Sequence, residues 1–175
     1  ADINRARIDG VTPLFVACYY GHRAVAELLL DSGADINQAN SDGITPLWGA
    51  CANGQLAVVE LLLARGADIN QAKDDGQTPL FIACKSEKLA VVELLLDRGA
   101  DINQAMQDGT TPLIEACYNG HIEVVKLLLD RGVSINQAKV NGVTPLSSAC
   151  AGRHSAVVEL LVLSKKIKGY TPENL

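Results

Sequence analysis

One short phrase recurs five times along this chain at a fixed interval of 33 residues. It reads DGVTPLFVAC from 9, DGITPLWGAC from 42, DGQTPLFIAC from 75, DGTTPLIEAC from 108 and NGVTPLSSAC from 141. A fixed period of this size indicates a repeat architecture, in which each unit buries its apolar face against its neighbours. We therefore expect a stack of five similar units.

Each unit is predicted to hold a turn and two helices. The Asp-Gly pair suits a tight turn, and the Thr-Pro that follows suits a helix start, because threonine caps the first turn and proline lacks an N–H that would go unpaired there. A second helix with apolar residues three and four apart follows, as in LAVVELLLARG at 56–66, and a glycine ends it. The ADINQA segments are expected to be extended.

The break between the two helices differs among the units. Gly21, Gly54 and Gly120 lie there in units one, two and four. Unit three instead has Ser86-Glu87-Lys88, and unit five has Gly152-Arg153-His154. We expect these two turns to be less regular than the others.

A 33-residue unit of a turn and two helices, with TPL-x-x-A near its start, resembles the ankyrin repeat. The resemblance covers essentially the whole chain and implies an all-α solenoid of stacked helix-turn-helix units with short β-turn fingers. We expect a single domain over 1–175, with 1–8 as the tail of a preceding repeat and repeats starting near 9, 42, 75, 108 and 141. Residues 164–175 would form a truncated C-terminal cap, with a new turn and helix at Gly169-Tyr170-Thr171-Pro172.

Several reactive residue types recur at one position per unit, which indicates structural roles. The cysteines are Cys18, Cys51, Cys84, Cys117 and Cys150. Neighbouring helices lie about 8–10 Å apart, whereas a disulfide needs Cα atoms within about 7 Å, so we expect these thiols to be buried and unpaired. Because a metal or catalytic site needs one convergent set of groups, we expect no enzyme activity, no cofactor and no metal.

Histidine and aspartate follow the same logic. His22, His121 and His154 share the start of the second helix, where a hydrogen bond to the neighbouring turn is expected. Asp35, Asp68 and Asp101 repeat one environment three times, whereas general acid–base catalysis needs carboxyl groups in different environments.

Charge and hydropathy exclude two kinds of partner. The formal net charge is −5 with both signs interspersed, so the clustered Lys and Arg that nucleic acid requires are missing. No apolar run approaches the roughly 20 residues of a membrane-spanning helix, and the first residues lack the pattern of a signal peptide. We expect a monomer in a reducing compartment, either cytoplasmic or nuclear, that contacts no membrane.

The positions that differ between units are expected to form a binding surface. In ankyrin-like stacks the turn tips and first helices line the concave face that meets partners, and all aromatic residues except Tyr170 follow either TPL or the cysteine of a repeat. We therefore expect a protein or peptide partner. The family's usual histidine after TPL is replaced by Phe15, Trp48, Phe81, Ile114 and Ser147. For the three aromatic residues among them, interior packing is an equal alternative.

The predicted contacts fall into two groups, according to whether they lie on a first helix or at a turn tip. Those on first helices or directly after them are Tyr19, Tyr20, Trp48, Asn53, Phe81, Lys85, Glu115, Tyr118 and Asn119. Those at the tips are Asp74, Gln77, Met106, Gln107 and Thr110.

Two other functions stay open. The chain could be an engineered or library-derived ankyrin scaffold without a natural partner, although a designer would usually choose alanine where every unit has cysteine. Ankyrin-like repeats also resemble substrates of asparagine hydroxylation, and Asn37, Asn70 and Asn103 have matching L-x₅-A-D-I-N contexts.

Overall fold

The computed structural model describes residues 2–168, in which ten α-helices and no strand occur. The first helices of the repeats are α1 (Pro13–Tyr19), α3 (Pro46–Ala52), α5 (Pro79–Lys85), α7 (Pro112–Asn119) and α9 (Pro145–Ala151). The second helices are α2 (Arg23–Asp31), α4 (Leu56–Ala64), α6 (Leu89–Asp97), α8 (Ile122–Asp130) and α10 (Ser155–Lys168). The predicted turn and helix at 169–172 lie outside the described residues.

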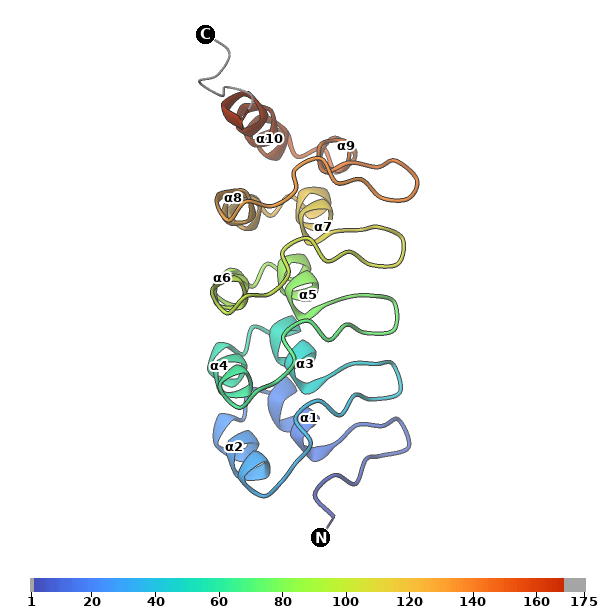
Figure 1. The fold of residues 1–175 in the computed structure, drawn as a ribbon, viewed down its shortest axis with the longest axis vertical. Coiled ribbons are helices and arrows are strands. Elements are labelled where there is room, and N and C mark those ends of the chain that lie inside the picture. The colour runs from blue at the N-terminus through green and yellow to red at the C-terminus, as the bar shows by residue number, and fades with distance from the viewer. Residues whose placement is uncertain (1, 169–175) are drawn as a thin grey trace. The chain divides into compact units, whose positions relative to one another are not determined.

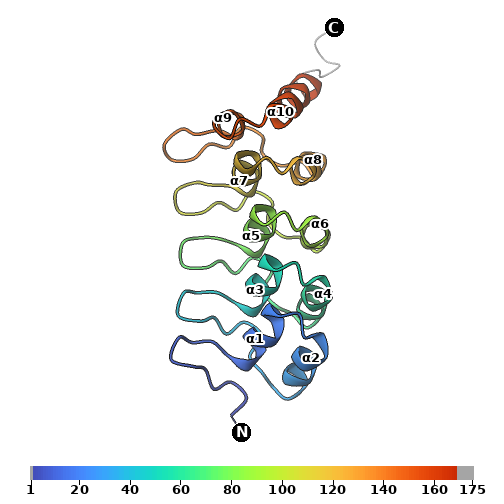
Figure 2. The same cartoon turned by 180° about the vertical axis from the view of Figure 1, so that it is seen from behind.

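The chain divides into two compact units, Ala1–Asp101 and Ile102–Leu175. In the first unit α1, α3 and α5 form one row, α2, α4 and α6 form a second, and the loop before each first helix projects to one side (Figure 1). In the second unit α7 packs on α9 and α8 on α10, with the loops again beside the first helices (Figure 2). The predicted all-α ankyrin-type repeat fold is confirmed; a single domain over the whole chain stays a prediction.

The first helices begin as predicted. Each has proline in its first turn and a threonine N-cap, whose hydroxyl oxygen accepts a hydrogen bond from the backbone N–H three residues later at 3.0 to 3.2 Å. The second helices end two residues before the predicted glycines, which are Gly33, Gly66, Gly99 and Gly132. The recurring Thr-Pro and Gly residues therefore fix the helix boundaries.

The break between helices has a left-handed residue in every repeat, glycine or not. Gly120 has φ of 76°, and at the matching positions Glu87 has φ of 54° and Arg153 has φ of 60°. Glycine there also leaves room for the next repeat: a Cβ on Gly120 would collide with the ring of His154. The turns of the third and fifth repeats, which we expected to be less regular, thus follow the same backbone course as the others. Glu87 and Arg153 adopt there a conformation that favours glycine.

The prediction that ADINQA is extended is wrong, because each such segment contains a turn. In the first, the carboxylate of Asp35 accepts a hydrogen bond from the N–H of Asn37 at 3.0 Å, which closes a turn at Ile36 and Asn37. The turn directs the side chain of Asn37 to the next repeat, where its Oδ1 accepts from the N–H of Asp68 at 3.0 Å. The same bond joins Asn103 to Ser134 at 2.8 Å.

The cores of both units consist of apolar residues that recur in each repeat. The leucine after each Thr-Pro is buried in four repeats, and Cys18, Cys51, Cys84 and Cys117 are buried beside them. The expectation of a buried thiol is wrong for Cys150, which is exposed. Cys18, Cys51 and Cys117 are each followed by a further repeat of the same unit, whereas no described helix pair follows Cys150.

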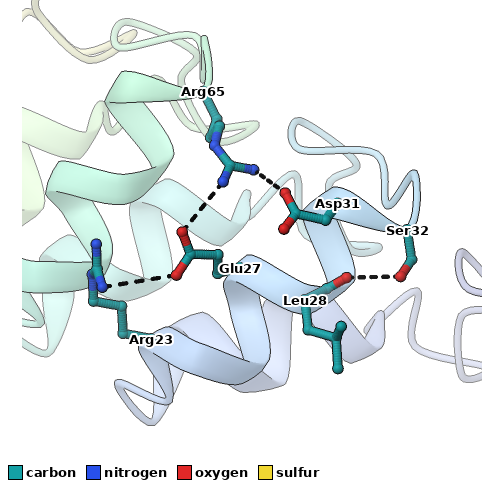
Figure 3. A network of polar contacts seen from close by, with 6 residues as sticks. All are labelled: Arg23, Glu27, Leu28, Asp31, Ser32 and Arg65. Atoms are coloured by element: carbon teal, nitrogen blue, oxygen red, sulfur yellow. Dashed lines mark hydrogen bonds and ion pairs between the residues drawn. The ribbon is translucent and has the colours of Figure 1, made fainter.

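A network of ion pairs joins α2 to the residue that follows α4. The guanidinium of Arg65, after α4, lies 2.6 Å from the carboxylate of Asp31 and 3.3 Å from that of Glu27 on α2, while Arg23 lies 3.8 Å from Glu27 (Figure 3). These groups are partly exposed, so the network adds at most about 1 kcal/mol per pair and supports the stack rather than a site.

Candidate binding surface

In each unit the loops before the first helices and the exposed sides of those helices form a continuous lining, which we call the finger face. In the first unit Arg7 and Val11 from the loop and Phe15, Val16, Tyr19 and Tyr20 at α1 enclose a hollow of about 310 Å³. In the second unit residues of α7, α9 and the loop between 139 and 143 enclose a hollow of about 390 Å³. Hollows of this size accept side chains or small groups of a ligand.

A cluster of aromatic rings lies at the hollow of the first unit. The ring centroids of Phe15 and Tyr19 are 5.9 Å apart, and Tyr20 meets Tyr19 edge to face at 5.1 Å. The ring of Phe15 approaches α3 closely because Gly49 has no side chain; a Cβ there would lie 3.3 Å from the ring. Tyr19 is 39% exposed and Tyr20 is 64% exposed. The contact of Phe15 with Gly49 thus holds the cluster against α3, while the two tyrosine rings remain exposed to solvent.

The position after TPL differs in depth from repeat to repeat. Phe15 and Trp48 are half-buried, and Trp48 has a buried indole N–H without a hydrogen-bond acceptor among the described residues. Phe81 is only 2% exposed and packs in the interior. Thr110 is also 2% exposed, and its hydroxyl donates to Asp108 at 2.6 Å. Phe81 and Thr110 are buried and line neither hollow, so we leave them out of the proposal below.

Two of the polar residues predicted on or after the first helices have hydrogen-bonded side chains. The amide nitrogen of Asn53 donates to the carbonyl oxygen of Gly49 at 2.9 Å, and that of Asn119 donates to the carbonyl oxygen of Glu115 at 2.9 Å. These bonds to the preceding helical turn leave the amide oxygens available. Lys85, Asn53, Asn119 and Tyr118 are exposed, Tyr118 by 55%, and Glu115 is half-buried.

The predicted tip residues differ in exposure. Asp74 and Gln107 are exposed, whereas Met106 and Gln77 are half-buried, and the amide of Gln77 donates to Asp75 at 2.9 Å. The hydroxyl and the N–H of Thr110 donate to Asp108 and hold the pKa of its carboxyl below the ordinary value, with a smaller contribution from Lys139. These bonds tie Gln77 and Thr110 to their own loops.

Several histidine and cysteine side chains, residue types that could support catalysis, have structural contacts or are buried. One ring nitrogen of His154 lies 3.0 Å from the carbonyl oxygen of Tyr118 in the preceding repeat, which confirms the predicted contact to the neighbouring turn for this histidine. Burial raises the pKa of Cys18 and of Cys117 to about 12. Within residues 2–168 no cluster of histidine, cysteine, aspartate or glutamate has the arrangement of a metal site.

No described helix has both the length and the apolar character that a membrane crossing needs.

Sequence reasoning missed part of the lining of both hollows. Val16 is exposed in the first, and Lys139, Val143 and the small residues Ser147, Ser148 and Ala151 line the second. The signal for the second hollow is a run of small residues at positions where other repeats have Trp48, Ile82 or Lys85.

Comparison with protein families agrees with this architecture. The family profile described as ankyrin repeats in three copies matches residues 37–106 and 103–172, and the profile of the single ankyrin repeat matches residues 9–41. No curated protein matches the sequence.

Proposed function

The chain belongs to the ankyrin-repeat family, whose members are generally protein–protein interaction modules, and we propose that it binds a protein or peptide partner on its finger face. The family is typically non-catalytic, and we propose the same for this chain. The observation that carries the proposal is the exposure of Tyr19, Tyr20 and Tyr118 beside the two hollows. Tyrosine gives a large contact area with little side-chain entropy to lose, and it is enriched at interface hot spots.

Ordered side chains support binding on this face. Tyr19 is held between Phe15 and Tyr20, and Asn53 and Asn119 are each tied to the preceding helical turn. Binding immobilises side chains at about 0.5–1.5 kcal/mol each, and a face that is ordered beforehand avoids part of this loss. The tips Asp74 and Gln77 in the first unit and Gln107 in the second would add polar contacts at the rim of the finger face.

The charges on this face favour a protein or peptide over a polyanion. Lys85 and Lys139 supply positive charge, and Asp108 and Glu115 supply negative charge. A nucleic acid would need a surface of one sign. We propose a monomer that works in the cytoplasm or nucleus, where its unpaired thiols are stable.

An affinity pull-down from cell lysate, with prey identified by mass spectrometry, tests the proposal. The bait is compared with a Tyr19→Ala, Tyr20→Ala, Tyr118→Ala variant whose fold is verified by circular dichroism. A control with Leu56→Ala, Leu89→Ala and Leu163→Ala removes exposed apolar side chains from second helices instead. Prey held by the chain and the control but lost by the tyrosine variant supports the proposal; prey held equally by all three places binding elsewhere.

Asparagine hydroxylation stays a second hypothesis. The side-chain oxygens of Asn37, Asn70 and Asn103 each accept a hydrogen bond from the following repeat at 2.8 to 3.0 Å, so a hydroxylase would need a locally opened repeat. An intact mass that is unchanged after incubation with an asparagine hydroxylase, iron and 2-oxoglutarate excludes this role. An engineered scaffold would use the same face, and the tyrosine variant applies equally to it.

A further inference from the structure

The hollow of the second unit lies between α7 and α9 and is largely apolar. Its walls come from Ile114 and Tyr118 on α7, from Val143 in the loop, and from Ala151 on α9. Ser147 is exposed at its edge, and Ser148, only 4% exposed, also lines it. The volume of about 390 Å³ exceeds what a single methyl or hydroxyl group fills, so the hollow suits a large side chain.

The first unit shows which group occupies the matching place there. Gly49, Phe15 and Tyr19 correspond to Ser148, Ile114 and Tyr118, each 99 residues later, which is three repeats of 33. The rings of Phe15 and Tyr19 both lie within 3.6 Å of the Cβ position of Gly49. In the second unit Tyr118 keeps its ring, whereas Ile114 has no ring to set beside it. The hollow therefore lies where a sister repeat has an aromatic side chain.

The same substitution occurs on the other wall. The residue after TPL is aromatic in the first three repeats, as Phe15, Trp48 and Phe81, but is Ser147 in the fifth. The fourth and fifth repeats have Ile114 and Ser147 after TPL, and both residues line the hollow. Two aromatic rings that other repeats have at this position are therefore absent from the hollow.

The charges and hydrogen-bonding groups that line the hollow indicate which kind of large ligand side chain fits it. Glu115 and Lys139 bring opposite charges, and Lys139 also lies 3.6 Å from Asp108, so the lining as a whole complements an uncharged group. The hydroxyl of Ser148 has no hydrogen bond within the described part of the chain and can pair with a polar group on a ligand. A ring with a polar edge satisfies both conditions.

We propose that this hollow is an anchor site for a tyrosine or tryptophan side chain of an extended partner segment. The ring packs against Tyr118 and Val143, above the buried Ile114, and its hydroxyl or indole N–H pairs with Ser148. The inference rests on the proposed function, since it names the chemistry of the partner at the same finger face.

Titration of the ¹⁵N-labelled chain with N-acetyl-tyrosinamide and with N-acetyl-leucinamide, followed by NMR, tests the anchor without a known partner. We expect saturable shifts of the Tyr118, Ser148 and Ala151 amides with the tyrosine probe, and at least threefold weaker binding of the leucine probe. Equal affinity for the two probes, or no shift at these amides, overturns the proposal.

A plugged variant sharpens the test. Ser147→Phe places at this position the residue that the first and third repeats have after the same threonine cap, so it is expected to fold and to abolish the shifts. Ser134→Phe is the matched control, because it makes the same change at an exposed serine that does not line the hollow. Undiminished shifts in the folded Ser147→Phe variant contradict the anchor.

Selection of a displayed random-peptide library on the chain separates this inference from the proposed function. Selected peptides that share Tyr or Trp at one position, and that bind the Ser134→Phe variant but not the Ser147→Phe variant, support both the proposed function and the anchor site. Peptides that bind without a shared aromatic residue support a binding module and overturn the anchor. If no peptide binds, the proposed function is contradicted, and the amide titration alone decides whether the hollow takes the ring.

Discussion

The side-chain oxygen of Asn70 accepts a hydrogen bond from the backbone N–H of Asp101, 31 residues later, at 2.9 Å. Asn4 makes the same bond to Asp35 at 2.8 Å, and Asn37 makes it to Asp68. A turn inside each ADINQA segment directs the asparagine to the next repeat. One side chain per repeat thus ties the start of one loop to the start of the following one.

Replacing Asn70 should loosen this connection. Asn70→Ala leaves the N–H of Asp101 without this acceptor, and we expect a loss of about 1 kcal/mol in the free energy of unfolding, measured by urea denaturation. Asn70→Asp keeps an acceptor oxygen and should lose less. Identical urea midpoints for the wild type and Asn70→Ala would show that the bond contributes nothing to the stack.

The five cysteines should differ sharply in reactivity. Burial raises the pKa of Cys18 and Cys117 to about 12, and it also raises the pKa of Cys51 and Cys84, so these thiols form almost no thiolate at pH 8. Only Cys150 is exposed. We expect one iodoacetamide adduct in the native protein, none in Cys150→Ser, and five in denatured wild type, all measured by intact mass. Rapid addition of two or more adducts to the native chain would show that the buried thiols are accessible.

The left-handed position between the helices offers two stabilising changes. Glu87 and Arg153 have φ of 54° and 60°, where a non-glycine residue is disfavoured by about 1–2 kcal/mol. Because glycine also loses more entropy on folding, we expect Glu87→Gly and Arg153→Gly each to stabilise by about 0.5–1 kcal/mol in urea unfolding. In the reverse test Gly120→Ala should destabilise, since its Cβ would meet the ring of His154. Loss of stability in both glycine variants would refute this reasoning.

Acid should weaken the loop that contains Asp108. The hydroxyl and N–H of Thr110 lower the pKa of this carboxyl in the folded state, so its contribution is present above the unfolded pKa of about 4 and is lost as pH falls through the lowered value. Asp108→Asn removes the titrating group. We expect the Tm advantage of the wild type over this variant at pH 7 to vanish by about pH 2. A difference that is constant with pH would rule out this carboxylate as its source.

The fold followed from the sequence because its determinants are local and repeated. Threonine caps the first helix in every repeat, and the left-handed turn forms even where Glu87 replaces glycine. The turn inside ADINQA was missed because it depends on a hydrogen bond that the side chain of Asp35 accepts from the N–H of Asn37.

The candidate surface was only partly predictable. Position in the repeat gives the direction of a side chain but not the volume of its neighbours, so Phe15 and Phe81 share one column and yet differ in burial. The hollow beside Ser148 arises from several small residues that come together only in the stack. Cys150 differs from its column because no described helix pair follows it.

The affinity of a recovered partner or selected peptide for single variants tests the central claim most directly. Isothermal titration should give at least tenfold weaker binding for Tyr118→Ala, which corresponds to about 1.4 kcal/mol, and unchanged binding for Glu123→Ala on the second helix of the same repeat. Equal affinities for the wild type and Tyr118→Ala, or a loss only in Glu123→Ala, would contradict binding through the tyrosines of the finger face.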